Sequence, residues 1–189
     1  YSTKKYLNRK ILFERMKIKI KNLSPLVIFA YNRLEHLKKT IESLKKCKLS
    51  KNTNLIIYLD NYNKESDKQR VINIKNFIHK IKGFKKITLI QRKKNLGMSK
   101  NIILGVSQTL KKFKKGIFLE DDMILDKYFL EYMNFYLEFY KNNKKVSSIH
   151  GYSYPTNKAL PEYFFLKGAD CWGWATWERA WKLYSNNSE

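Results

Sequence analysis

The chain alternates short, continuous apolar runs with longer stretches in which apolar residues recur every three or four positions. Each apolar run has the length of a strand buried on both faces of a sheet, and each periodic stretch has the spacing of an amphipathic helix. The strands are expected at Pro25–Ala30, Asn54–Leu59, Lys86–Ile90 and Gly116–Leu119, with a fifth at Val146–His150.

The periodic stretches between these strands predict four helices. Asn32 is expected to cap the first helix with Glu35 as its capping-box partner, and the fourth helix is expected from about Asp126 to Lys141. The expected buried stripes are Leu34, Leu37, Ile41 and Leu44; Val71, Ile74, Ile78 and Ile81; Ile102, Ile103, Val106, Leu110 and Phe113; and Phe129, Met133, Tyr136, Leu137 and Tyr140.

A strand followed by a helix, repeated with short connections, predicts an α/β fold. The sheet is expected to be mostly parallel and twisted, with helices on both faces, as in Rossmann-like nucleotide-binding domains. After the fifth strand the pattern changes to a turn-rich loop at 151–161 and a short strand at Tyr163–Leu166. A last helix is then expected to place Trp177, Trp181 and Tyr184 on one face, with the two tryptophans one turn apart in the core.

Polar residues follow four of the expected strands at their carboxyl ends. They are Asn32-Arg33, Asp60-Asn61, Asn95 to Lys100, and Glu120 to Asp122. Because ligands of open α/β sheets bind outside the carboxyl ends of the strands, these clusters predict one shared site at that edge.

The acidic triplet Glu120-Asp121-Asp122 is the main candidate for chemistry in this sequence. Converging carboxylates repel one another and favour a nearby cation. Oxygen ligands alone suit Mg²⁺ or Mn²⁺, and a site with few protein ligands suits a metal that also holds a diphosphate. The alternative is a solvated acidic turn before a helix N-terminus.

Composition and charge add a preference for anionic partners. The 189 residues suit one domain, and Lys+Arg 39 against Asp+Glu 16 gives a formal charge of +23. Such a chain attracts nucleic acid, an anionic membrane or charged glycolipid. The alternative explanation is codon bias, because an AT-rich genome also favours Lys, Asn and Ile.

The two cysteines and the absence of a long apolar run bear on location. Cys47 and Cys171 lie far apart and outside any metal-binding spacing, so they are expected to be free thiols in a reducing compartment. No run approaches the length of a membrane span. The expected location is cytoplasmic, with peripheral contact at the inner face of the cytoplasmic membrane.

Three parts of the chain are expected. Residues 1–24 form a basic lead-in, with apolar spacing that suits an amphipathic helix and an alternating stretch at Met16–Ile20 that suits a strand equally well. Residues 25–150 form the α/β half that carries the four polar clusters. Residues 151–189 form a further segment, expected to be incomplete at its C-terminal end.

Several of these segments together resemble a known family. Pro25–Arg33, Leu59-Asp60, Asn95–Gly97, Phe118–Asp122 and Cys171–Trp177 are similar to segments of GT-A nucleotide-sugar glycosyltransferases. The likeness is to bacterial family-2-like enzymes and to the N-acetylglucosaminyltransferase I type, whose acidic, DXD-like triplet is also Glu-Asp-Asp. It extends over roughly Pro25 to Tyr184. The resemblance implies that residues 25–150 bind a nucleotide-sugar donor and that residues 151–189 lie on the acceptor side.

The resemblance implies a donor site for a UDP-sugar. Asp122 would hold Mn²⁺ or Mg²⁺ bridging the diphosphate, while Glu120 and Asp121 would face the ribose and sugar. Asp60 would accept a hydrogen bond from the uracil N3–H. The remaining donor-binding residues implied are Ala30, Tyr31, Asn32 and Arg33 at the base, and Asn95, Gly97 and Lys100 beside the diphosphate.

The acceptor side implies a base and an aromatic platform. Inversion at the anomeric carbon needs one general base, for which Glu178 and Asp170 are the candidates, or an acid beyond Glu189. Trp172 and Trp174 are expected to stack on the acceptor, a glycan or lipid-linked glycan.

Three other functions compete with sugar transfer. The charge alone suggests a nucleic-acid-binding protein, but most aromatic residues have core spacing and no such binding motif is present, so no nucleic-acid partner is expected. A nucleotidyltransferase would need a glycine-rich loop after the first strand, where the chain has Ala30–Arg33. A truncated transferase would bind donor without turnover.

Overall fold

The structure is a computed structural model that describes residues 22–155, 157, 161 and 164–185. A six-stranded sheet runs through it in the order β3-β2-β1-β4-β6-β5. The strands are β1 (Leu26–Ala30), β2 (Asn54–Leu59), β3 (Lys86–Gln91), β4 (Lys115–Glu120), β5 (Ser148–His150) and β6 (Trp174–Trp177). Strands β3, β2, β1 and β4 are parallel, and β6 pairs antiparallel with both β4 and β5.

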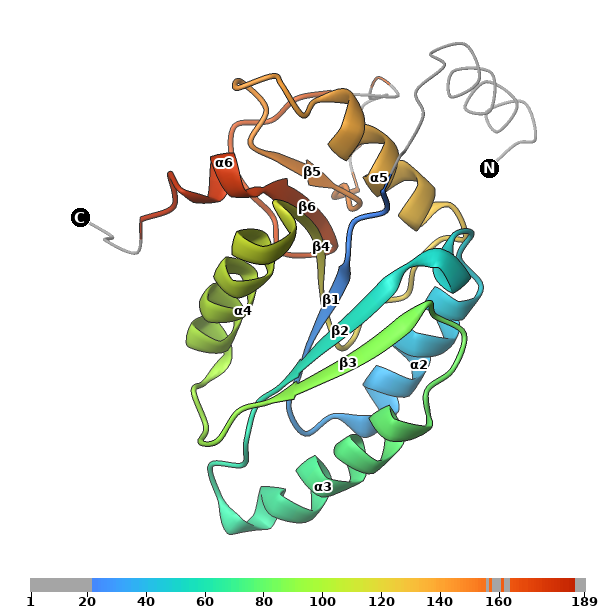
Figure 1. Cartoon of the computed structure of the whole chain (residues 1–189), viewed down its shortest axis with the longest axis vertical. Helices are drawn as coiled ribbons and strands as arrows, with labels where there is room; N and C mark the ends of the chain where they lie inside the picture. Colours follow the sequence, from blue (N-terminus) through green and yellow to red (C-terminus); the bar gives the residue numbers. More distant parts are fainter. Residues whose placement is uncertain (1–21, 156, 158–160, 162–163, 186–189) are drawn as a thin grey trace.

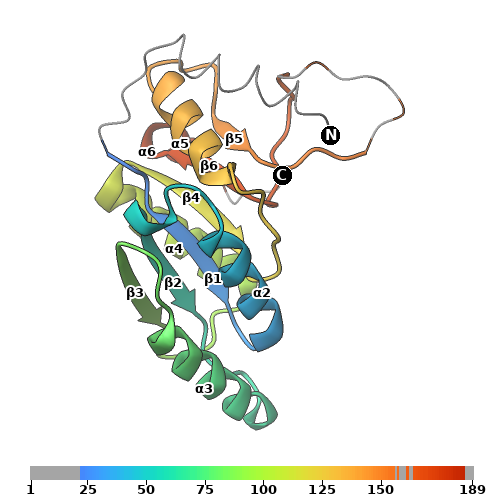
Figure 2. The ribbon, with the colours of Figure 1, turned by 90° about the vertical axis from the view of Figure 1, so that its right-hand side faces the viewer.

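Helices cover both faces of this twisted sheet (Figure 1 and Figure 2). They are α2 (Leu34–Lys45), α3 (Glu65–Lys80), α4 (Met98–Phe113), α5 (Phe129–Phe139) and α6 (Glu178–Trp181), with a 3-10 turn, η1 (Ser50–Asn52). Helices α2, α3 and α5 pack on one face, and α4 packs on the other. The predicted α/β fold class, with a mostly parallel sheet and helices on both faces, is confirmed.

Two apolar cores follow from the alternation of side chains along the strands. Leu26 and Ile28 of β1 point into the larger core beneath α2, α3 and α5, while Val27 and Phe29 point into the smaller core beneath α4. Every residue of β1 is buried, as expected of a central strand covered on both faces.

The predicted capping box at the start of α2 is wrong. The residue in the N-cap position is Arg33, and no side chain makes a cap hydrogen bond there. The Asn32 amide instead donates to Asp67, 35 residues away. A tertiary hydrogen bond has therefore replaced the local one that the sequence suggested.

The C-terminal tryptophans also differ from the prediction. Trp177 lies in β6, not in a helix, and it is buried against α5, where its indole N–H donates to the Leu137 carbonyl. Trp181 lies in the short helix α6 and donates to Ser107 of α4. The two rings therefore lie on opposite faces of the sheet, and Tyr184 stacks on Trp181 from beyond the helix.

Smaller differences concern element ends. The fifth strand is shorter than predicted, and α5 begins three residues later. Phe164–Leu166 of the predicted short strand are not extended in a sheet, and Tyr163 lies outside the described residues. The predicted lead-in helix or strand also lies outside them, apart from residues 22–24. Strand β6 of the expected acceptor-side segment lies between β4 and β5, so the two predicted parts share one sheet.

Candidate functional site

The expected polar clusters do meet at one edge of the sheet. Strand order reverses between β1 and β4, because β2 and β3 continue on one side of β1 while β4 lies on the other. The loop after β1 and the acidic triplet after β4 therefore lie on the two sides of the crevice where α/β sheets bind ligands.

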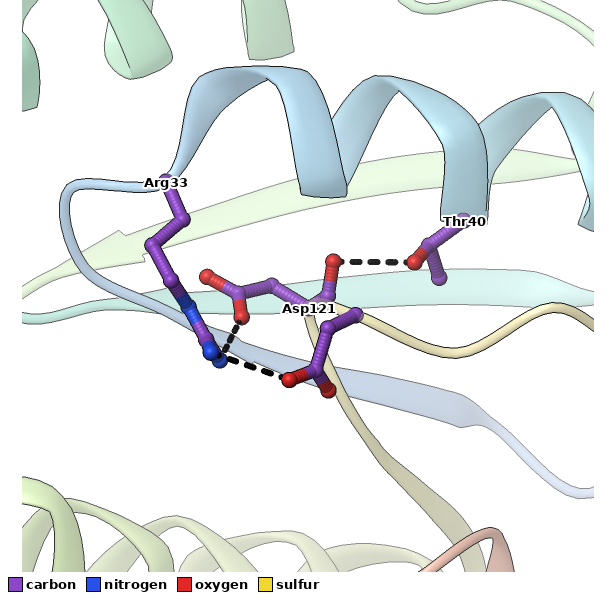
Figure 3. A network of polar contacts seen from close by, with 4 residues as sticks. Arg33, Thr40 and Asp121 are labelled. Carbon is purple, nitrogen blue, oxygen red and sulfur yellow. Dashed lines mark hydrogen bonds and ion pairs between the residues drawn. The ribbon is translucent and has the colours of Figure 1, made fainter.

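Arg33 joins these two loops by an ion-pair bridge (Figure 3). Its guanidinium donates one hydrogen bond to Asp121 and another, at 2.9 Å, to Asp122. The main chain of Asp121 is also fixed, since its carbonyl accepts a 2.9 Å hydrogen bond from the Thr40 hydroxyl of α2. The site is thus built from β1, α2 and β4 together.

Burial divides the three acids of the triplet. The Asp121 side chain is 3% exposed, whereas the Asp122 side chain is 36% exposed. Burial raises the pKa of Asp121, and Arg33 opposes that rise. Burial likewise raises the pKa of Glu120, which a hydrogen bond with the Cys171 thiol counteracts. Asp122 is the acid of this triplet most open to a ligand.

The loop after β1 is tied to the start of α3 through Asp67. The Tyr31 hydroxyl and the Asn32 amide each donate to a different Asp67 oxygen at 3.0 Å. The Tyr31 oxygen in turn accepts the Asn63 N–H. The hydrogen bond from Asn32, and after it the bond from Tyr31, lower the pKa of Asp67. From the sequence, Asp67 could be read only as an ordinary acid in the first turn of a helix.

Asp60 holds the loop that leads into α4. Its buried carboxylate accepts the backbone N–H groups of Asn61, Leu96 and Gly97 at 2.9–3.2 Å. Asn95 reinforces the loop by donating to the Asn61 carbonyl and accepting from the Gly97 N–H. Gly97 has φ +74°, a left-handed conformation that favours glycine.

The cations near this loop include the predicted Lys100 and a second one, Arg92. Lys100 is exposed in the first turn of α4. Arg92, which the sequence analysis did not single out, is half-buried at the end of β3 and donates to Asn101 and Gln108. Its guanidinium also lies over the Tyr58 ring, 4.8 Å from the centroid. Burial lowers the pKa of Arg92.

An aromatic cluster lies beyond the triplet, where β5 ends and β6 begins. Trp172 is 41% exposed and its ring contacts those of Tyr152 and Tyr154. Asp170 is in the same cluster. Its carboxylate accepts the backbone N–H of Trp172 at 2.7 Å, and its hydrogen bond with the Tyr154 hydroxyl raises the pKa of Tyr154. Trp172 and Asp170 are therefore neighbours at the expected edge.

Two predicted site residues do not present their side chains to the crevice. Trp174 pairs with Phe118, two residues before the triplet, but its ring packs against Phe118 and Trp181 on the α4 face of the sheet. Glu178 follows the last residue of β6, which pairs with Lys115 at the opposite end of β4, and its carboxylate forms a 2.9 Å ion pair with Lys114. Because β6 runs antiparallel to β4, its first residues approach the triplet and its last residues lie a strand length away.

The carboxylate oxygens at this edge suit a divalent cation that is held by few protein ligands. Within the described part of the chain, no three His, Cys, Asp or Glu side chains gather into a ready-made metal site. Asp122 nevertheless presents an exposed carboxylate beside the crevice, with hard oxygen atoms of the kind that Mg²⁺ and Mn²⁺ prefer.

The helices of the described residues were also compared with the length and hydropathy of a membrane span. None of them combines the length and the apolar character that crossing a membrane requires.

Comparison with protein families matches residues 26–185 to the family model of glycosyl transferase family 2. The chain belongs to glycosyl transferase family 2. The match spans every strand and helix described above. Among curated proteins, none matches the sequence.

One solved structure, with a TM-score of 0.50, supports the fold. S. aureus TarS 1–349 resembles this family-2 chain with a TM-score of 0.50 at 15% identity, over 82% of this chain and 47% of that one. TarS 1–349 in complex with UDP gives 0.45 at 16%, over 71% and 38%. A mannosyltransferase from Pyrobaculum calidifontis, in complex with GDP-Man and Mn²⁺, gives 0.40 at 7%, over 76% and 42%. The chain spans less than half the length of the matched chain in each of these three structures.

Proposed function

We propose that this chain is the donor-binding part of a metal-dependent glycosyltransferase. It would move a sugar from a UDP-sugar to a glycan or lipid-linked glycan, with inversion at the anomeric carbon. The observation that supports this best is the exposed Asp122 carboxylate at the crevice between β1 and β4 of a family-2 fold. The likeness of the Glu-Asp-Asp triplet to N-acetylglucosaminyltransferase I belongs to the same proposal.

The triplet and Arg33 supply the charge balance for the leaving diphosphate. Asp122 would hold Mn²⁺ or Mg²⁺, and that ion would neutralise charge on the departing diphosphate. Asp121 keeps Arg33 in place through its buried ion pair. Glu120, half-buried beside Cys171, is positioned to accept hydrogen bonds from ribose or sugar hydroxyls.

The nucleoside would lie over the loops after β1 and β2. Tyr31 and Asn32 are fixed by Asp67, so Ala30–Asn32 offers a pre-formed wall for the base. The two Asp60 oxygens accept three backbone N–H groups, and the Leu96 N–H is shared between them. Asp60 would also accept the uracil N3–H. Asn95, Gly97 and Lys100 would lie on the diphosphate side.

Asp170 is the described acid that we assign as the general base. It lies beside Trp172 at the site edge, whereas Glu178 lies at the opposite end of β4. Trp172, Tyr152 and Tyr154 form a partly exposed aromatic surface on which the apolar face of an acceptor sugar would stack. Asp170 would then take the proton of the attacking hydroxyl.

Calorimetric titration of UDP, with Mn²⁺ and then with EDTA, tests the donor site. We expect micromolar binding that needs the metal and disappears in Asp122→Ala. Glu35→Ala is the matched control, because it removes one exposed carboxylate from α2, where Glu35 pairs only with Lys38 among the described residues. Equal UDP binding with and without metal, or in Asp122→Ala, would refute the metal-dependent site.

The formal charge of +23 favours nucleic-acid binding as the second candidate function. That function predicts binding to generic DNA with a steep salt dependence and no affinity for UDP. Fluorescence anisotropy with a labelled duplex at 50 and 200 mM salt, alongside the calorimetry, separates the two functions.

A further inference from the structure

One guanidinium lies among three consecutive carboxylates, and its two contacts are unequal. The contact of Arg33 with Asp121 is buried on the carboxylate side, since the Asp121 side chain is 3% exposed. The contact with Asp122 is open, since the side chains of Arg33 and Asp122 are 40% and 36% exposed. Different parts of the guanidinium make them: Nη2 contacts Asp121 and Nη1 contacts Asp122.

These two contacts have different strengths for physical reasons. A buried carboxylate that lost its cation would be left desolvated and unpaired, which is costly. An exposed ion pair gains little, because water solvates both partners once they separate. The Asp121 contact should therefore persist, and the Asp122 contact should exchange readily with another cation.

Building on the proposed function, we propose that Arg33 is a positioning residue that competes with the divalent cation for Asp122. When the cation binds Asp122, Arg33 gives up that contact and keeps its contact with Asp121. The released Nη1 N–H group then donates to a phosphate oxygen of the nucleoside diphosphate. Arg33 thus neutralises the triplet before the ligands arrive and the diphosphate after they bind.

This exchange makes metal and nucleotide binding cooperative. Metal alone must displace Arg33 from Asp122 with no new partner for the guanidinium. It therefore binds a few-fold more weakly than it would if Arg33 were absent. A diphosphate compensates by accepting the released N–H, so metal binds more tightly when nucleotide is present. By linkage, the nucleotide gains the same factor from the metal.

The test is a titration of the protein with Mn²⁺ alone, in which free Mn²⁺ is measured by its electron paramagnetic resonance signal. We expect Arg33→Gln to bind Mn²⁺ about two- to fivefold more tightly than the unaltered chain, because the competitor for Asp122 is gone. The strengthening of Mn²⁺ binding by UDP should shrink in the same variant. Circular dichroism checks that each protein is folded.

Two further variants sharpen the test. Lys38→Gln removes the same charge from α2 at a residue whose described ion pair is with Glu35, and should leave Mn²⁺ affinity unchanged. Arg33→Lys guards against misfolding of Arg33→Gln: one ammonium can remain with buried Asp121 but cannot span both acids. Its Mn²⁺ affinity should lie between those of the unaltered chain and Arg33→Gln.

The outcomes distinguish this inference from the proposed function. If UDP binds with metal through Asp122 but neither Arg33 variant changes the affinity for Mn²⁺ alone, the competition is refuted and the donor site stands. If neither the unaltered chain nor the variants bind Mn²⁺, with or without UDP, both proposals are refuted.

Discussion

At the residue scale, the candidate site is held together by side chains that bond across loops. Arg33 joins the loop after β1 to the acids after β4, and Asp67 joins the same loop to the start of α3. Asp60 fixes the turn before α4 through backbone N–H groups. Each of these residues therefore positions a neighbour that faces the crevice, which gives the ligand-free site a defined shape.

Asp67→Asn tests the positioning of the nucleoside wall. The substituted amide has one acceptor oxygen. If that oxygen stays with Asn32, the Tyr31 hydroxyl must accept instead of donate, and both 3.0 Å hydrogen bonds lose the carboxylate charge that strengthens them. We expect UDP affinity, measured by calorimetry with Mn²⁺, to fall several-fold because the wall is no longer pre-formed.

Glu65→Gln provides the comparison for that substitution. Glu65 lies in the same first turn of α3 and makes an exposed ion pair with Lys68. Its UDP affinity should equal that of the unaltered chain. An Asp67→Asn protein that binds UDP as tightly as Glu65→Gln would show that Asp67 has no part in positioning Tyr31 and Asn32.

At the element scale, the close packing of α4 on the sheet sets the position of the loop before it. Gly105 faces the sheet, and a Cβ there would lie 2.5 Å from Phe29 and 3.1 Å from Tyr58. Both rings belong to the core beneath α4, and they stack on each other. Helix α4 can approach the sheet this closely only because Gly105 has no side chain.

Gly105→Ala should therefore destabilise the protein. In an exposed helix the same change adds about 1 kcal/mol of stability, but overpacking a core costs about 1–3 kcal/mol, and the 2.5 Å approach to the Phe29 ring puts the cost here at about 2–3 kcal/mol. We expect a net loss of about 1–2 kcal/mol in the free energy of unfolding, measured by urea denaturation. Leu104→Ala, at the adjacent, partly exposed position of α4, should change it by no more than about 0.5 kcal/mol. Equal stability of Gly105→Ala and the unaltered chain would contradict the close approach.

At the scale of the whole molecule, the dominant property is the charge of +23. The described acids pair largely with neighbouring lysines and arginines, which leaves a large excess of cations. A transferase with a lipid-linked acceptor would gain from this excess, because an anionic membrane surface attracts it and so concentrates it near the acceptor.

We expect the chain to co-sediment with phosphatidylglycerol-containing vesicles at low salt. Raising NaCl to 0.5 M should release it, because the Debye length falls below the ~10 Å found at 0.1 M. Vesicles of phosphatidylcholine alone should not bind it at either salt concentration. Binding that persists in 0.5 M NaCl, or that is equal on neutral vesicles, would contradict an electrostatic attachment.

The sequence by itself determined the order of the elements from β1 to β5, the fold class and the edge at which the polar clusters meet. Runs such as Leu26–Ala30 and stripes such as Leu37, Ile41 and Leu44 are local patterns, because burial repeats with the period of the backbone. The convergence of the polar clusters follows from the parallel sheet that those patterns imply.

Only the tertiary structure decided which partners those site residues have. Arg33 and Asp121 lie 88 residues apart, and Asn32 reaches Asp67 instead of capping its own helix. The pairing of β6 with β4 placed Glu178 at the opposite end of β4, and packing on the α4 face turned the Trp174 ring away, while Trp172 stayed exposed near the triplet. Such contacts join segments whose separation in the chain carries no periodic signal, because they depend on the packing of several elements at once.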